Sequence, residues 1–406
     1  MLTPRQFLKD TMMTAAGLLT LAAATQAAPA PDVEEILKKL PEQAGKWEGP
    51  PIAPHANEWT AEVNEFSQGA PWVKVLYSHV VPTAKKTGAK VFLRPWDQST
   101  GPDGDPGAGG VKMASDVLKN LSHFSKDEWP DAISFQNEFN NVDEKTAQAF
   151  LDYYDTLREG GYEGLIIYGS YGPGGPTDAT EWERPHIRKC VEKADGIETH
   201  EYWDLTVKHS NTWLAHRHVR MMEMYPELKT KPWFIGEFGS DGVNQKEDPQ
   251  ARSGWNDRDK LTADEYIRQI RIYRSGDKAT GVVPPAKQVQ AVFLYQQGAA
   301  MGWEDWEVLG TPVADYMQST WKMNTGTIRG YVTDQKGNPV EGAEIVCWPG
   351  GETVKSDHQG RWWFFALPSR EYTLKAIKPG MKSSDLRKVG VSGGDMKRVD
   401  LKVIGE

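Results

Sequence analysis

The chain has 406 residues, of which 39% are hydrophobic and 25% are charged, a composition typical of globular proteins with sizeable cores. Its formal net charge is −9, with acidic and basic residues interspersed, which argues against nucleic acid as the main partner. The 16 tryptophans are an unusually large number, but indole rings stack on sugars and also fill cores. The composition therefore leaves carbohydrate binding and core packing equally open.

The N-terminus has the pattern of a secretory signal peptide. Arg5 and Lys9 precede an apolar segment over residues 11–24, which is too short to span a bilayer and is followed by small residues suited to cleavage. We expect residues 1–28 to direct export to the periplasm or the extracellular space, by a general or a twin-arginine-like route. A linker over residues 29–44 follows, and no later segment is expected to insert in a membrane.

Strand-like and helix-like segments then alternate over residues 45–323. Helices are expected over residues 113–124 and 207–224, and apolar residues at helical spacing between Ala147 and Leu157 predict another. Eight strands alternating with helices predict an α/β fold, the (β/α)₈ TIM barrel. The expected strands are residues 52–55, 72–78, 91–96, 132–137, 165–168, 196–202, 232–239 and 289–295.

The pattern changes near Asn324, after which no helical period is found. Short apolar runs are separated there by turn sequences rich in Gly, Asn and Pro, which predicts a C-terminal all-β sandwich over residues 324–406. The expected strands are residues 327–333, 344–348, 361–365, 372–377 and 399–403. Cys190 and Cys347 fall in different predicted domains, so we expect two buried thiols rather than a disulfide.

Two carboxylates stand at the ends of predicted strands. Glu138 follows the fourth strand and Glu237 lies near the end of the seventh, each beside apolar residues. A carboxylate in such surroundings is costly unless it is paired or functional. In a TIM barrel both would lie at the carboxyl end of the strands, where active sites form. This is the arrangement that glycoside hydrolysis needs, although two structural ion-pair partners are the alternative.

Three motifs carry a resemblance to a known group of enzymes. They are Asn137-Glu138, His200-Glu201-Tyr202 and Gly236-Glu237-Phe238-Gly239. In this order they resemble the fourth, sixth and seventh strands of clan A retaining glycoside hydrolases, over residues 45–320, and the middle motif is similar to that of cellulase-like family 5 members. The resemblance implies that Glu138 is the acid/base, that Glu237 is the nucleophile and that Asn137 holds the sugar 2-hydroxyl. It implies no cofactor and no metal.

Further substrate contacts are expected from His55, Arg94, Trp96, His200, Tyr202 and Trp303. Arg94 and Tyr202 are the expected hydrogen-bond donors to Glu237. Trp96, Trp203 and Trp303 are either sugar platforms or core residues. Family 5 members place an arginine after an earlier strand and a tryptophan on strand eight, whereas this strand ends in Tyr295-Gln296-Gln297. These departures leave the family within the clan open.

A second cluster of candidate ligands is formed by His209, His216 and His218. No carboxylate completes a metal-binding spacing with them, so a solvated helix face is the expected environment.

The C-terminal sequence resembles the carboxypeptidase regulatory-like (transthyretin-like) domain over residues 326–405. The matching segments are Gly330-Tyr331-Val332-Thr333-Asp334 and Asp357-His358-Gln359-Gly360. Together the two domains predict an exported, monomeric, retaining β-glycosidase that acts on an oligosaccharide or a polysaccharide. A carbohydrate-binding protein on a degenerate barrel and a transglycosylase using the same two glutamates are the alternatives.

Overall fold

The computed structural model describes most of the chain after residue 48. The described residues are 49–96, 109–138, 143–172, 175, 179–203, 207, 214–240, 254–255, 261–277, 279, 282, 284–298, 304–321, 325–350 and 353–405. The expected signal peptide, the linker, His209 and Trp303 lie outside these residues. The chain divides into two compact units, Trp47–Gly326 with Gly393–Asp395, and Thr327–Ser392 with Met396–Glu406, among the residues described.

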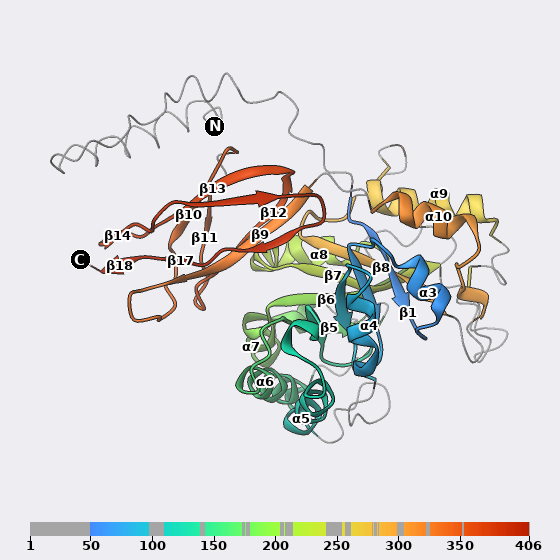
Figure 1. Ribbon diagram of the computed structural model, residues 1–406, viewed down its shortest axis with the longest axis horizontal. Coiled ribbons are helices and arrows are strands. Elements are labelled where there is room, and N and C mark those ends of the chain that lie inside the picture. The colour runs from blue at the N-terminus through green and yellow to red at the C-terminus, as the bar shows by residue number, and fades with distance from the viewer. Residues whose placement is uncertain are drawn as a thin grey trace. The chain divides into compact units, whose positions relative to one another are not determined.

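The first unit is a closed barrel of eight parallel strands in sequence order (Figure 1). Strand β1 pairs with both β2 and β8, with Ile52 opposite Val292, and this pairing closes the barrel. The expected TIM barrel is therefore confirmed. Its strands are β1 (Ile52–Ala56), β2 (Trp72–Val75), β3 (Lys90–Leu93), β4 (Ala132–Ser134), β5 (Leu165–Tyr171), β6 (Gly196–Trp203), β7 (Trp233–Ser240) and β8 (Val289–Gln297).

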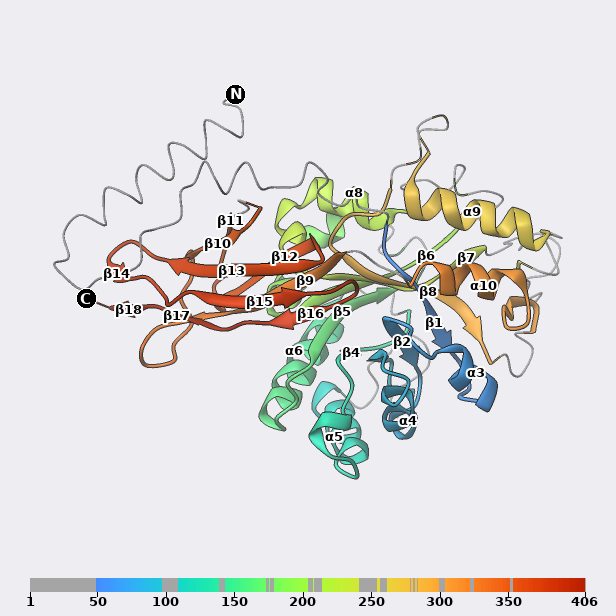
Figure 2. The same ribbon diagram turned by 45° about the horizontal axis from the view of Figure 1, so that its top comes forward.

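Helices follow the strands and lie outside the barrel, with α5 and α6 side by side in both views (Figure 1, Figure 2). They are α3 (Ala61–Phe66), α4 (Val81–Lys85), α5 (Gly110–Leu121), α6 (Glu144–Glu159), α7 (Pro185–Lys193), α8 (Arg217–Met224), α9 (Ala263–Ser275) and α10 (Pro312–Ser319). Side-chain caps start several of them; Asp143 accepts from the Thr146 amide at α6, and Thr262 from the Glu265 amide at α9. Within the described residues, α8 begins only at Arg217, because His216 before it adopts a left-handed conformation.

Alternate residues of each strand point into the barrel. The ring of Phe92 lies 5.1 Å from that of Phe234 and 5.3 Å from that of Phe293, so these three residues mark the inner face. The Lys74 ammonium lies 5.7 Å from the Phe92 ring and belongs to the same face. This apolar floor excludes water from beneath the carboxyl ends of the strands.

The outer face of β6 carries a buried polar network instead of a solvated surface. Glu201 accepts from the Nδ1 of His218 at 2.8 Å and from the Tyr273 hydroxyl at 2.6 Å. His216 is fully buried and its ring stacks on Tyr273 with centroids 4.2 Å apart. The expectation of a solvated helix face is thus wrong for both described histidines, because they close the layer between β6 and α9. Trp203 is also a core residue here and not a sugar platform, since it is fully buried.

The second unit is all-β, as predicted. One sheet has the order β11-β10-β13-β15, another the order β12-β9-β16 with β17 also pairing with β9, and β14 pairs with β18. The strands are β9 (Thr325–Thr333), β10 (Glu344–Trp348), β11 (Thr353–Lys355), β12 (Arg361–Pro368), β13 (Arg370–Ile377), β14 (Met381–Lys382), β15 (Arg387–Val391), β16 (Met396–Arg398), β17 (Leu401–Lys402) and β18 (Ile404–Gly405). The strand expected over residues 399–403 is wrong in extent, because β16 and β17 pair separately with β9.

One further expectation is met in the described part of the chain. Cys190 and Cys347 are both buried, and neither forms a disulfide. None of the described helices combines the length and the apolar character that crossing a membrane requires.

The apolar floor yields a stability prediction. Phe92→Ala removes a fully buried ring from between two others, so the free energy of unfolding should fall by about 3–5 kcal/mol, measured by urea denaturation. Val111→Ala, at a position 56% exposed on α5, is the control and should change it by less than about 0.5 kcal/mol. Equal effects of the two substitutions would contradict the packing described.

Candidate active site

The backbone of β7 is shaped to place Glu237 at the carboxyl end of the barrel. The residue before it, Gly236, has no Cβ, and a Cβ at this position would overlap the Glu198 carboxylate on β6. The Gly236 carbonyl accepts a hydrogen bond of 2.9 Å from the Lys74 ammonium. The glycine therefore brings the backbone of β7 close to a buried ion pair, and Glu237 follows directly.

Four side chains surround the Glu237 carboxylate, which is only 6% exposed as a residue. The Tyr202 hydroxyl donates to Oε2 at 2.9 Å, and the Nδ1 of His200 lies 3.4 Å from the same oxygen. Oε1 lies 3.3 Å from the Nε2 of His55 and 3.9 Å from the Lys74 ammonium. Burial alone would raise the pKa of Glu237, but the positive charge of His200 and the contacts with His55 and Lys74 hold it well below its usual range. The carboxylate is therefore ionised at neutral pH.

One of the two expected hydrogen-bond donors to this carboxylate is found, and an ion-pair partner takes the place of the other. Tyr202 donates as predicted, and burial raises its pKa well above its usual range, so the phenol keeps its proton. Arg94 makes no described contact with Glu237, whereas Lys74 on β2 does. The cation beside Glu237 therefore comes from strand two and not from strand three.

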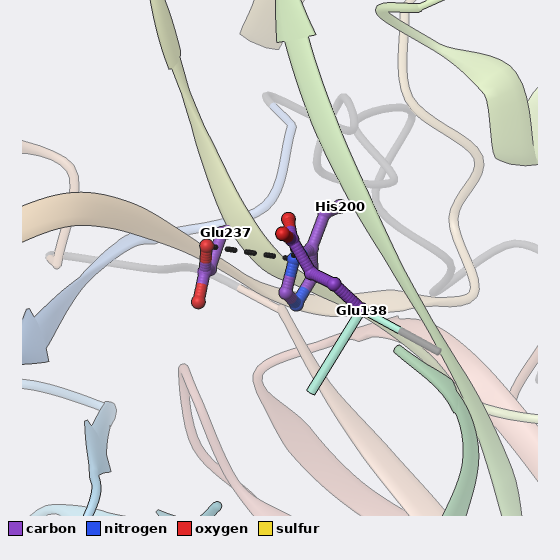
Figure 3. Close-up of side chains that lie close together, drawn as sticks. All are labelled: Glu138, His200 and Glu237. Atoms are coloured by element: carbon purple, nitrogen blue, oxygen red, sulfur yellow. Dashed lines mark hydrogen bonds and ion pairs between the residues drawn. The ribbon is translucent and has the colours of Figure 1, made fainter. Parts of the chain in front are cut away.

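Glu138 lies near Glu237 at the carboxyl end of the barrel, although β4 and β7 are separated by two strands. It follows β4 with a backbone φ of 41°, a left-handed conformation that costs free energy in a residue other than glycine. Its side chain is 34% exposed, and its Oε1 lies 3.0 Å from the Nδ1 of His200. Figure 3 shows the His200 ring beside both carboxylates, and one ligand atom from each of Glu138, His200 and Glu237 lies within 4.8 Å of the others. Two strands thus present a buried and a solvent-accessible carboxylate to the same small volume.

His200 and His55 differ in charge although both are fully buried. Burial lowers the pKa of His200, but Glu237, Glu138 and Glu198 together raise it to about 9. Burial lowers the pKa of His55 to about 4, since it has fewer negative neighbours. At neutral pH the site consequently contains a positive His200 and a neutral His55.

An ion pair beneath the site was not anticipated from the sequence. The Lys74 ammonium lies 2.9 Å from Oε1 of Glu198, and the Ser170 hydroxyl donates to Oε2 at 2.5 Å. Burial alone would raise the pKa of Glu198, but Lys74 and His200 lower it to about 2. The signals were a lysine inside the apolar run of β2 and a glutamate two residues before His200, on the same face of β6.

Aromatic side chains border the site on the β8 side. Tyr202 and Tyr295 each make edge-on contacts with Trp306, with centroids 5.6 and 5.4 Å apart. Asn57 donates to the Tyr295 hydroxyl at 3.1 Å. Trp306, which follows β8 in the chain, thus packs against both tyrosine rings, and it is 4% exposed.

The remaining predicted contacts lie on the β3 and β4 sides. Arg94 is 5% exposed and its guanidinium lies 5.1 Å from the ring of Trp96, which is 53% exposed. Asn137, directly before Glu138, is half-buried, and its side-chain oxygen has no hydrogen-bond partner among the described residues.

The cluster of Glu138, His200 and Glu237 has the ligand types of a metal site. Two features oppose a cation there. The raised pKa of His200 means that the ring carries both protons, and the Lys74 ammonium lies 3.9 Å from Glu237. The local charges therefore suit proton transfer better than metal binding.

Comparison with known proteins confirms the expected C-terminal domain: residues 327–403 match the carboxypeptidase regulatory-like domain family. The matched residues make up less than half of the chain. A search of curated proteins with the chain found no match. A structure of a streptococcal ancillary pilin is 15% identical and covers 20% of this chain and 32% of that chain, with a TM-score of 0.18. The chain thus spans about a third of that pilin.

Two further solved structures match the barrel. A GH113 β-mannanase from Alicyclobacillus acidocaldarius is 15% identical and covers 68% of this chain and 99% of that chain, with a TM-score of 0.43. A β-D-glucuronidase from Dictyoglomus thermophilum is 13% identical and covers 68% of this chain and 50% of that chain, with a TM-score of 0.44. The barrel assignment itself rests on the strand order β1 to β8.

The buried ion pair yields a second stability prediction. Lys74→Met removes the closer of the two cations beside the buried Glu198 carboxylate, so the free energy of unfolding should fall by about 3–5 kcal/mol in urea denaturation. Adding Glu198→Gln removes the buried carboxylate charge and should recover part of this loss.

The control for the Lys74→Met substitution is Lys85→Met. Its partner Asp131 lies 3.0 Å away at a partly exposed site, so the loss should stay below about 1 kcal/mol. A Lys74→Met protein as stable as the Lys85→Met protein would show that the buried pair contributes little.

Proposed function

We propose that this protein is a retaining glycoside hydrolase that cleaves β-glycosidic bonds of an oligosaccharide or a polysaccharide. The observation that carries the proposal is the pair of carboxylate oxygens from Glu138 and Glu237 within 4.8 Å of each other at the carboxyl ends of β4 and β7. Retaining glycosidases hold their two carboxyl groups about 5–5.5 Å apart, whereas inverting enzymes need about 6.5–9.5 Å. The short separation favours retention.

In the first step Glu237 acts as the nucleophile. It is ionised and held by Tyr202, so an oxygen lone pair attacks the anomeric carbon while the bond to the leaving oxygen breaks. Glu138 donates its proton to that oxygen. The products of this step are the freed alcohol and a glycosyl ester on Glu237.

In the second step Glu138 takes a proton from water, and the water oxygen attacks the anomeric carbon from the face that the leaving group vacated. The ester bond breaks and Glu237 is released as a carboxylate, so the configuration is retained after two inversions. Glu138 is the more exposed of the two acids, which suits a group that exchanges protons with water. His200, in contact with both carboxylates, is assigned to hold their relative position.

The remaining predicted residues would contact the sugar. Asn137 has an unused side-chain oxygen for the 2-hydroxyl, a contact that strengthens as positive charge develops on the ring. Trp96 offers an exposed indole for stacking. Export through residues 1–28 is part of the proposal, since polymeric glycans are met outside the cell.

Azide rescue tests the assignment of the two acids. After a screen of β-glucans, mannans and xylans identifies a substrate, Glu237→Ala should lower kcat by at least about 10³-fold. Azide should restore turnover of a glycoside with an activated leaving group and give a glycosyl azide of inverted configuration, because it replaces the nucleophile. With Glu138→Ala the ester still forms, so azide should give the retained product. The configurations are read by NMR.

The control is Glu371→Ala in the second unit, at a side chain 64% exposed, which should keep the activity of the unaltered protein. The same product configuration from both variants would make the assigned roles wrong. Binding of glycans without any turnover would favour the carbohydrate-binding alternative, and transfer to a sugar acceptor in place of water would favour the transglycosylase.

A further inference from the structure

Arg94 is a buried cation that faces the barrel mouth. It follows Phe92 by two positions, and Phe92 points into the barrel, so the strand alternation places Arg94 on the inner face at the carboxyl end of β3. Its positive charge acts on both His55 and Tyr295, which border Glu237. The guanidinium therefore belongs to the site and not to the outer helix layer.

No protein group in the described part of the chain neutralises this cation. Nε and Nη1 of Arg94 are buried and have no hydrogen-bond partner there, although the residue is only 5% exposed. The other two cations of the site are matched, because Lys74 lies 2.9 Å from Glu198 and His200 lies 3.4 Å from Glu237. An unpaired buried guanidinium is costly, and a planar fork of donors fits a carboxylate best.

The numbers of cations and carboxylates in the site also favour an anionic group on the substrate. The cations are Lys74, Arg94 and His200, and the carboxylates are those of Glu138, Glu198 and Glu237. Because the proposed first step uses a proton carried by Glu138, three cations face two carboxylates in the reacting complex. One anion from the substrate would restore neutrality beside the residue that lacks a partner.

The neighbour of Arg94 is suited to hold a sugar ring. Trp96 is 53% exposed and its ring lies 5.1 Å from the guanidinium. An exposed indole beside a buried guanidinium offers a stacking face for the ring and a charged fork for a group on its edge. A sugar that carries a carboxylate has both features.

We propose that Arg94 and Trp96 recognise the carboxylate of a hexuronic acid residue, so that the substrate is an acidic glycan. This inference rests on the proposed function and deepens it by naming the substrate class. Arg94 makes two parallel hydrogen bonds to the uronate oxygens, and Trp96 stacks on the pyranose ring.

The test compares β-glycans that carry uronic acids with the same glycans after carboxyl reduction, which replaces only the carboxylate by a hydroxymethyl group. Reducing-end release should give a kcat/KM at least about tenfold higher on the uronate form, because each charge-assisted pair is worth about a factor of ten or more. Arg94→Gln should remove most of this preference by lowering the uronate value far more than the neutral one.

Two further variants keep the test decisive if Arg94→Gln folds poorly. Arg94→Lys keeps the charge without the planar fork and should retain only part of the preference. Trp96→Ala alters an exposed side chain and should lower kcat/KM for both forms by similar factors. Calorimetry on the Glu237→Ala protein, with uronate and carboxyl-reduced oligosaccharides, gives the same comparison without turnover.

The outcomes separate this inference from the proposed function. Hydrolysis of neutral glycans with no uronate preference, and equal losses on both forms in Arg94→Gln, would overturn the inference and leave the hydrolase standing. Stronger preference for a sulfated glycan would also overturn it. Binding of uronate oligosaccharides that depends on Arg94, without hydrolysis of any glycan, would support the recognition and reject the enzyme.

Discussion

The site depends on positive charge placed beneath and beside Glu237. A carboxylate buried at the end of an apolar strand would otherwise take up a proton, since burial alone raises its pKa. Lys74 and His200 prevent this, and each is itself held by Glu198. Alternating charges connect Lys74, Glu198, His200 and Glu237, so the ionised state of Glu237 depends on the charged groups around it.

Strand β6 holds this arrangement in place from two sides. Its inner face carries Glu198, His200 and Tyr202, which contact the other charged groups of the site. Its outer face carries Glu201, whose pKa is lowered to about 2, since His218 and Tyr273 outweigh the effect of burial. A strand with ionised groups on both faces cannot shift by one residue without exposing carboxylates to apolar surroundings. The register that aligns His200 with Glu237 is fixed in this way.

The sequence predicts the fold well because local patterns determine it. Each barrel strand is an apolar run between Gly, Pro or polar residues, and Glu138 and Glu237 are visible as acids at the ends of two such runs. The partners of those acids are not visible, because barrel closure joins positions far apart in the chain. Lys74 therefore occupies the place expected of Arg94, and the buried network around His218 replaces an expected solvated face, since spacing along one helix does not reveal what packs against it.

Gly236 makes the residues at positions 74, 198 and 236 depend on one another. Its hydrogen at the Cβ position leaves room for the Glu198 carboxylate, and its carbonyl receives the Lys74 ammonium. A larger residue there would displace Glu198 and so deprive Lys74 of its anion. Positions 74, 198 and 236 should consequently be inherited together in relatives of this chain, and an engineering library that randomises any one of them alone would be depleted of folded members.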